Sequence, residues 1–258
     1  MQKNILMALF FAVAAWLFLP SCGSDTNNNE GLQAPETAQT ETPAAASQTE
    51  KDDDDDDDAN EAKATASSMK GTETVAATNI KNLLTAYAGE TTASAKYAAY
   101  SKKAQEEGLT QIALLFKATS TSEKIHANNH RAVLEELGVA IPNVNPEYTV
   151  KTTQENLADA ISGESYEIAT MYPDFMATAT AAGDDLSGTS LKYAYRTEQK
   201  HKLLYEKAMM ALQSNQVNTL SSDYSVCPTC GNTYDSKAPK RCRISMTDGA
   251  KFIKINTV

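Results

Sequence analysis

The sequence is poor in cysteine and has no excess of positive charge, and each shortage excludes a class of protein. Only four cysteines occur among 258 residues. Cys22 stands alone near the N-terminus and the other three lie together near the C-terminus, which is not the pattern of a disulfide framework. The net charge is −10, whereas binding to nucleic acid requires a basic surface. We therefore expect no nucleic-acid partner.

Residues 22–72 lack large apolar side chains almost completely and contain an unbroken run of aspartates, Asp52 to Asp58. Such a segment cannot bury enough surface to offset the entropy lost on ordering, and its like charges repel one another. The composition predicts a disordered acidic tether. An acidic tail that attracts metal ions is the alternative.

Residues 1–21 have the features of an export signal. Lys3 supplies the positive start, and the apolar stretch from Ile5 to Leu19 is short for a membrane span. It ends in Leu19-Pro20-Ser21-Cys22, which resembles the bacterial lipoprotein cleavage box. The resemblance predicts that Cys22 is acylated and anchors an exported protein to the periplasmic or cell-surface side of a bacterial membrane. An ordinary signal peptide or an uncleaved anchor is the alternative.

The rest of the chain, up to about residue 215, is dominated by helical periodicity. Apolar residues recur at steps of three and four in four long stretches, which are separated by glycines or prolines. The third stretch begins with a capping box of Thr152 and Glu155, and Pro173 inside it predicts a kink near Tyr172. A crossover at 139–151 joins the two hairpins, as in a ferritin-like four-helix bundle. The four predicted helices cover residues 73–107, 110–137, 152–183 and 184–212.

The motif Glu-x-x-His occurs twice within these stripes, at Glu123/His126 and at Glu198/His201. Each copy follows a Gly-Glu pair, with Glu90 33 residues before the first copy and Glu164 34 residues before the second. This spacing indicates an internal duplication. At a rise of about 1.5 Å per residue, antiparallel packing brings all four motifs to a similar depth in the bundle.

The inward-facing stripes lack lysine and arginine, although they carry several carboxylates. Burying one unpaired carboxylate costs several kcal/mol, and burying several together adds their mutual repulsion. A buried salt-bridge network would need cationic side chains that these stripes do not have. Two divalent cations would neutralise the cluster, and oxygen-rich ligation with one imidazole per metal favours iron or manganese over zinc. One Glu from each of two helices and Glu-x-x-His from the other two is the pattern of di-iron bundles.

The chain resembles the rubrerythrin family over about residues 69–257. The resemblance is carried by residues 83–90, by both Glu-x-x-His motifs, by Gly163-Glu164-Ser165-Tyr166-Glu167 and by Met171-Tyr172-Pro173. It implies two iron ions and adds Glu167 to the ligands, with one iron moving between His126 and Glu167 on redox change. The implied metal ligands of the bundle are Glu90, Glu123, His126, Glu164, Glu167, Glu198 and His201.

The same resemblance implies an oxidoreductase that reduces hydrogen peroxide to water in oxidative-stress defence. Glu167, Tyr97 and Tyr172 are then the catalytic candidates, although core packing accounts for the two tyrosines equally well. His130 is expected to pack beside the ligands and not to bind metal. The family also implies a homodimer. The electron donor is unknown, because soluble nicotinamide-dependent reductases are cytoplasmic and this chain is expected to be exported.

Residues 222–258 resemble a rubredoxin-like module with one ligand replaced. Cys227, Cys230 and Cys242 match three ligands of a four-cysteine site, whereas the fourth position is Ser245. A hydroxyl is a harder and less acidic ligand than a thiol, so the site is expected to hold iron or zinc less tightly. A Cys227–Cys230 disulfide is the alternative.

Two further functions compete with the peroxidase. One is a ferritin-like protein that oxidises or holds iron with oxygen as the oxidant. The other is a scaffold without catalysis, whose bundle holds zinc or no metal.

Overall fold

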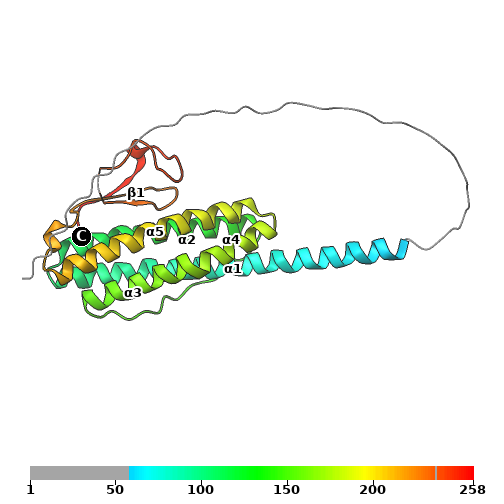
Figure 1. Ribbon diagram of the computed structural model, residues 1–258, viewed down its shortest axis with the longest axis horizontal. Helices are drawn as coiled ribbons and strands as arrows, with labels where there is room; N and C mark the ends of the chain where they lie inside the picture. Colours follow the sequence, from blue (N-terminus) through cyan, green and yellow to red (C-terminus); the bar gives the residue numbers. More distant parts are fainter. Residues whose placement is uncertain (1–57, 236) are drawn as a thin grey trace, which may run out of the picture. The chain divides into compact units, whose positions relative to one another are not determined.

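The computed structural model describes residues 58–235 and 237–258 (Figure 1). The expected export signal, the expected acylation site at Cys22 and the expected tether as far as residue 57 lie outside the described residues. The described chain is mainly helical, with a small sheet near the C-terminus. Its α-helices are α1 (Asp58–Glu106), α2 (Thr110–Glu136), α3 (Thr153–Tyr166), α4 (Tyr172–Ala181) and α5 (Asp185–Gln213).

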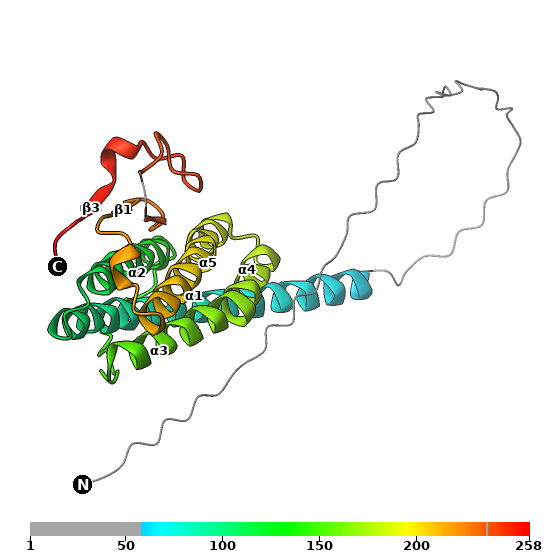
Figure 2. The same cartoon turned by 60° about the vertical axis from the view of Figure 1, so that its left-hand side comes forward.

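The helices form the expected four-helix bundle, because α3 and α4 follow one another as a single broken helix. A one-turn π-helix, Glu167–Met171, joins them. α1 pairs with α2 in one hairpin, and the α3–α4 rod pairs with α5 in the other (Figures 1 and 2). The fold class predicted from the periodicity is confirmed.

Helix α1 begins at Asp58, 15 residues before the predicted start of the first helix, so its first turns fall within the predicted tether. Residues 58–72 are helical. They include several alanines, which have the highest helix propensity, and a negative residue at the positive end of the helix dipole. Sequence hydrophobicity misses such a segment because a helix does not require an apolar face in order to form.

The π-helical turn interrupts the third predicted helix close to the place where a kink was expected. Pro173, in the second position of α4, has no backbone N–H to donate to the preceding turn. A π-helical turn accommodates one extra residue within a helix and is often found at functional sites. Here it changes the register of the helix between Glu164 and Tyr172.

Local signals set the ends of the helices as the sequence predicts. Gly108 and Gly183 follow the first helix of each hairpin with φ of +74° and +66°, a conformation that glycine adopts without strain. The hydroxyl of Thr152 accepts a hydrogen bond from the Glu155 amide, and the Glu155 carboxylate accepts one from the Thr152 amide. Asp184 caps α5 by accepting a hydrogen bond from the Ser187 amide at 3.0 Å.

Two apolar clusters fill the bundle, and a polar layer lies between them. The first cluster contains the rings of Tyr97, Phe116 and Tyr205. The second contains Leu134 and Tyr172. On every helix the predicted metal ligands fall between residues of the first cluster and residues of the second, so apolar layers close the polar layer on both sides.

The C-terminal module is a three-stranded antiparallel sheet in the order β2-β1-β3. Two 3₁₀ turns, Val217–Thr219 and Gly249–Lys251, precede the first and last strands. The module contacts α2 and α5 of its own chain (Figure 2). Among the described residues, no helix is both long enough and apolar enough to cross a bilayer. The strands are β1 (Tyr224–Val226), β2 (Thr233–Tyr234) and β3 (Ile253–Ile255).

Candidate metal centre

Six of the seven predicted bundle ligands meet in two overlapping groups within the polar layer. In each group, one ligand atom per residue lies within 4.8 Å of the others. Glu123 from α2 and Glu198 from α5 belong to both groups. The first group adds Glu90 and His126, and the second adds Glu164 and His201. All six side chains are at most 2% exposed.

The two shared glutamates are placed to bridge a pair of cations. Glu123 directs one carboxylate oxygen to His126 Nδ1 and the other to His201 Nδ1, both at 3.0 Å. Glu198 does the same at 2.9 and 2.7 Å. Glu90 completes the His126 side at 3.5 Å, and Glu164 completes the His201 side at 4.0 Å. Each histidine therefore belongs to one metal position, and each bridging carboxylate spans both.

The polar atoms of this layer are arranged to bind metal ions and not to form hydrogen bonds with one another. Within the part of the chain that the structure describes, both carboxylate oxygens of Glu123 and of Glu198 are buried without a hydrogen-bond partner, as is the Nδ1 of each histidine. These atoms lie close together, but not with the angles of hydrogen bonds. Leaving them unsatisfied would be costly. Carboxylate oxygens and histidine nitrogens that point to common centres without bonding to one another are expected at a two-metal site.

The pKa directions agree with a layer that holds more negative charge than it tolerates without cations. Burial and repulsion from Glu123 raise the pKa of Glu90 to about 8. Burial and Glu198 raise the pKa of Glu164. The pKa of Glu123 is lowered to about 2, because the attraction of His201 and His126 outweighs the effect of burial. Without metal, protons must take the place of cations at several of these groups.

Two tyrosines hold the outer glutamate of each metal position. The hydroxyl of Tyr97 donates to Glu164 Oε1 at 3.0 Å, and that of Tyr172 donates to Glu90 Oε1. Both rings are almost fully buried. The two tyrosines are therefore packed in the core and also bonded to the outer glutamates, and their catalytic role stays a prediction.

Glu167, the seventh predicted ligand, lies beside the two groups and is not part of them. It begins the π-helical turn and is partly exposed, unlike the other six. Burial of its carboxyl group and repulsion from Glu90, Glu164 and the shared glutamates raise its pKa. Its carboxylate is thus close enough to interact with the site, but it does not occupy a ligand position in this structure.

The C-terminal module covers the outer side of both histidines. His126 Nε2 lies 3.1 Å from the carbonyl oxygen of Cys230, and His201 Nε2 lies 3.1 Å from Thr233 Oγ1. Because Nδ1 faces the metal positions, Nε2 carries the hydrogen in both rings and donates it to the module. Ser122 and Thr197 add hydrogen bonds to the carbonyls of the same loop, at 2.7 Å to Gly231 and 3.1 Å to Cys230.

Sequence reasoning missed these module contacts and also missed the environment of His130. His130 Nδ1 lies 2.8 Å from Ser190 Oγ, and its Nε2 lies 3.4 Å from the hydroxyl of Tyr172. The expectation that His130 is not a ligand agrees with its absence from both ligand groups.

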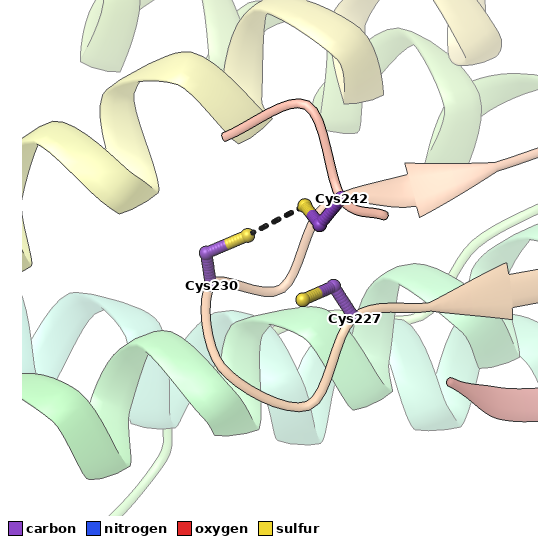
Figure 3. A group of neighbouring side chains, drawn as sticks. All are labelled: Cys227, Cys230 and Cys242. Atoms are coloured by element: carbon purple, nitrogen blue, oxygen red, sulfur yellow. Dashed lines mark hydrogen bonds between the residues drawn. The ribbon is translucent and has the colours of Figure 1, made fainter. Parts of the chain in front are cut away.

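The three C-terminal cysteines form a second candidate metal site within the module. Their sulfur atoms face a common point in Figure 3, and Cys230 Sγ lies 3.5 Å from Cys242 Sγ. Ser245 Oγ lies 3.2 Å from Cys227 Sγ and takes the fourth corner. Hydrogen bonds from Cys230 and Ser245 lower the pKa of Cys227 to about 4, whereas the same contact with Cys227 raises the pKa of Cys230. The two thiols therefore share one proton, which a metal ion would displace. All three thiols are free, so the alternative disulfide is absent from this structure.

Comparison with known proteins is consistent with this geometry. The family model named Rubrerythrin matches residues 81–209. Rubrerythrin-2 of Clostridium acetobutylicum is 31% identical over 181 residues, which is 67% of this chain and 98% of that protein. A rubrerythrin of Porphyromonas gingivalis is 32% identical over 192 residues, 74% of this chain and 94% of that one. The structure titled as fully reduced, all-ferrous nigerythrin has a TM-score of 0.62 at 31% identity, covering 68% of this chain and 86% of that one.

Proposed function

Because the chain belongs to the rubrerythrin family, we propose that it is a di-iron peroxidase that reduces hydrogen peroxide to water. The observation that carries this proposal is the pair of metal positions bridged by Glu123 and Glu198, with Glu167 as an additional carboxylate beside them. A plain iron-binding bundle has no need of that extra carboxylate.

Iron at the two positions would supply the chemistry, since two ferrous ions together provide the two electrons that cleave one O–O bond. The side chains have separate tasks. Glu123 and Glu198 would each hold both ions, and His126 and His201 would each hold one. The apolar clusters on either side exclude bulk water from the layer.

Reduction of peroxide to two waters also consumes two protons, and Glu167 is the best candidate to hold one. In the metal-free layer, burial and the neighbouring carboxylates raise the pKa of Glu167. Its carboxyl group interacts with the layer without belonging to either ligand group, so it is available for proton transfer.

Metal analysis of the purified protein followed by stopped-flow oxidation tests this function. The ferrous protein is mixed with peroxide in one series and with oxygen in another, and zinc-loaded protein is the redox-inactive control. Oxidation by peroxide that is much faster than oxidation by oxygen supports the peroxidase. A preference for oxygen would instead indicate an iron-oxidising protein, and a bundle that holds only zinc or no metal would indicate a scaffold.

We also propose that the protein is exported and held at a membrane by acylation of Cys22. The Leu19-Pro20-Ser21-Cys22 sequence after a short apolar stretch supports this placement. Cys22→Ser should move the protein from the membrane fraction to the soluble fraction and abolish labelling by a radioactive fatty acid. Labelling that persists in Cys22→Ser would rule out this anchor.

The assembly and the reductant are also proposals. The family resemblance supports a homodimer, which light scattering of the purified protein tests. The electron donor is expected to be an exported or membrane-bound protein, because the chain is proposed to lie outside the cytoplasm. The cysteine module, which contacts both histidine ligands, is the expected point of entry for electrons.

A further inference from the structure

A line of hydrogen bonds leaves the metal centre on one side and crosses all four helices of the bundle. It starts at Glu90 on α1, passes through Tyr172 on α4 and His130 on α2, and ends at Ser190 on α5. His130 and Tyr172 are fully buried, and Ser190 is 5% exposed. The surroundings are apolar, with Leu134 and Leu191 in the same core cluster.

The direction of each hydrogen bond follows from the number of hydrogens available. With cations in the site, the Glu90 carboxylate only accepts, so the single hydroxyl hydrogen of Tyr172 is donated to it. The oxygen of Tyr172 can then only accept, and the donor must be Nε2–H of His130. Burial and the nearby His126 lower the pKa of His130 to about 3, so the ring is neutral and its Nδ1 carries no hydrogen. Ser190 therefore donates to Nδ1.

The opposite tautomer would have the opposite effect on the metal centre. If Nδ1 of His130 carried the hydrogen, Nε2 would be an acceptor facing the hydroxyl of Tyr172. That acceptor would compete with Glu90 for the only hydrogen of the tyrosine. A serine hydroxyl can donate or accept, so Ser190 at 2.8 Å from Nδ1 is compatible with either tautomer. The tautomer is decided at the other end, where Tyr172 donates to Glu90 and needs a donor at Nε2, and Ser190 then donates to Nδ1.

The other half of the duplication shows that the bundle does not need this line in order to pack. The position equivalent to His130 is Tyr205, four residues after His201 as His130 is four residues after His126. The hydroxyl of Tyr205 pairs with Thr119 at 2.5 Å, and its ring packs against Tyr97 without a hydrogen bond to it. Tyr97 therefore holds Glu164 without a histidine behind it, and only the Glu90 side has the extension.

From this asymmetry we propose that Ser190 and His130 are positioning residues that fix the hydroxyl of Tyr172 in the direction of Glu90. Ser190 donates to Nδ1 and holds the His130 ring with its Nε2–H toward Tyr172, and His130 in turn leaves Tyr172 only one direction in which to donate. The pair thus acts on the Glu90 side of the metal centre through Tyr172 and touches neither metal position. This proposal rests on the proposed function for its effect on rate, but not for its effect on the tautomer.

The tautomer can be read directly because the chain has only three histidines. Protein labelled with ¹⁵N-histidine and loaded with zinc, which is diamagnetic, should give three ring systems by long-range ¹H–¹⁵N NMR. The signals absent from His130→Gln identify His130. We expect a protonated Nε2 and an unprotonated, hydrogen-bonded Nδ1 for this ring. A protonated Nδ1 in the unaltered protein would overturn the proposal.

Rates with matched variants test the consequence for the metal centre. Ser190→Ala should disturb the His130 signals and slow the oxidation of the ferrous protein by peroxide about tenfold, with the iron content unchanged. His130→Leu should be slower still, and His130→Gln, which retains an N–H donor, should recover part of the rate. Ser101→Ala is the control, since Ser101 is an equally buried serine that donates to the carbonyl of Ala113 at 2.8 Å, away from the line.

The outcomes separate the two proposals. Wild-type rates in both Ser190→Ala and His130→Leu would overturn the positioning role, and so would an equal loss in Ser101→Ala. If the unaltered protein does not react with peroxide faster than free iron does, the peroxidase proposal is wrong. The positioning role is then decided by the His130 tautomer, together with the affinity of the site for zinc in Ser190→Ala.

Discussion

Tyr97 and Tyr172 occupy equivalent positions in the two halves of the bundle, and each donates a hydrogen bond to the glutamate of the other half. Tyr97 of the first half holds Glu164, and Tyr172 of the second half holds Glu90. The two halves are therefore joined at the metal centre by more than the shared ligands. Each outer glutamate keeps its position only if the opposite hairpin is in place.

Because each tyrosine holds a glutamate of the opposite hairpin, loss of its hydroxyl should weaken metal binding by that glutamate. Tyr97→Phe and Tyr172→Phe each remove a hydrogen bond to a buried carboxylate, which is worth about 1.5–3 kcal/mol. We expect metal affinity to fall roughly tenfold in each variant while the helical content is retained. Competition with a chelator measures the affinity. Tyr100→Phe is the control, because its hydroxyl bonds to Asp159 and the carbonyl of Thr149, outside the metal centre.

The spacing of equivalent residues in the two halves also explains the π-helical turn, which was not predicted from the sequence. Tyr97 and Tyr172 are 75 residues apart, as are Gly108 and Gly183, whereas Glu90 and Glu164 are 74 apart. One extra residue must therefore lie between Glu164 and Tyr172, where the π-helical turn Glu167–Met171 is found. The same extra residue makes the spacing from Glu164 to Glu198 34 residues, against 33 from Glu90 to Glu123. The difference of one residue was the signal of the turn that begins at Glu167.

Glu167 should affect turnover more than folding or metal content. In Glu167→Ala both ligand groups remain complete, because Glu167 belongs to neither. A carboxyl group that transfers protons contributes about 100-fold or more to a rate, so we expect a loss of that order in peroxide turnover. Metal content and the midpoint of thermal unfolding should change little. Glu164→Ala is the matched comparison, since it should lose metal as well as activity.

If Glu167→Ala turned over peroxide at the wild-type rate, the extra carboxylate would have no catalytic role. If it lost iron as completely as Glu164→Ala, Glu167 would be a permanent ligand, and the arrangement in this structure would not be the metal-bound one.

The ligand residues were predictable, whereas their surroundings were not, for a physical reason. A ligand such as Glu123 is fixed by periodicity and by its spacing from His126, both of which are local in sequence. Ser190 and His130 are 60 residues apart, and His126 and Cys230 are 104 apart. Such pairings depend on how the hairpins and the module pack together. No periodic pattern marks a single serine or a backbone carbonyl as a partner.

Removal of the metal should make stability fall as the pH rises. Without cations, burial and its neighbours raise the pKa of Glu90 to about 8, well above that of an unfolded chain. The pKa of His201 is raised as well, because the attraction of Glu123 and Glu198 outweighs the effect of burial. In both cases the folded protein binds more protons than the unfolded chain, so the free energy of unfolding decreases with rising pH. The affected window runs from about pH 5 to pH 8.

The metal-loaded protein should show the opposite trend, because metal binding displaces these protons and tightens as they leave. Thermal unfolding of both forms between pH 5 and pH 8 measures the difference. Parallel curves for the two forms would show that the acidic layer does not titrate in this window.

The cysteine site should respond to restoring the missing thiol. Ser245 places its hydroxyl 3.2 Å from Cys227 Sγ, so Ser245→Cys would complete four sulfur ligands at the same corner. We expect tighter iron binding and the visible absorption of a ferric tetrathiolate, since a thiol ionises far more readily than a hydroxyl. Ser245→Ala should bind metal less tightly than the unaltered protein. Equal affinity in all three proteins would show that the fourth corner does not contribute a ligand.

Gly231 should control the contact between the module and the bundle. It has φ of +76°, and a Cβ atom at this position would overlap His126 Nε2 and Ser122 Oγ. Gly231→Ala therefore strains the backbone by about 1–3 kcal/mol and pushes the loop of Cys230 away from His126. We expect faster hydrogen exchange at the amides of this loop.

Gly188→Ala provides the matched control for Gly231→Ala, because the added methyl group meets no atom and lies within helix α5. It should leave the exchange of the module unchanged and stabilise the helix by up to about 1 kcal/mol. Unaltered exchange in Gly231→Ala would mean that the module does not rest on the ligand histidines of its own chain in solution. In that case His126 and His201 would have to donate their Nε2 hydrogens to another partner, and removing the module should leave metal affinity unchanged.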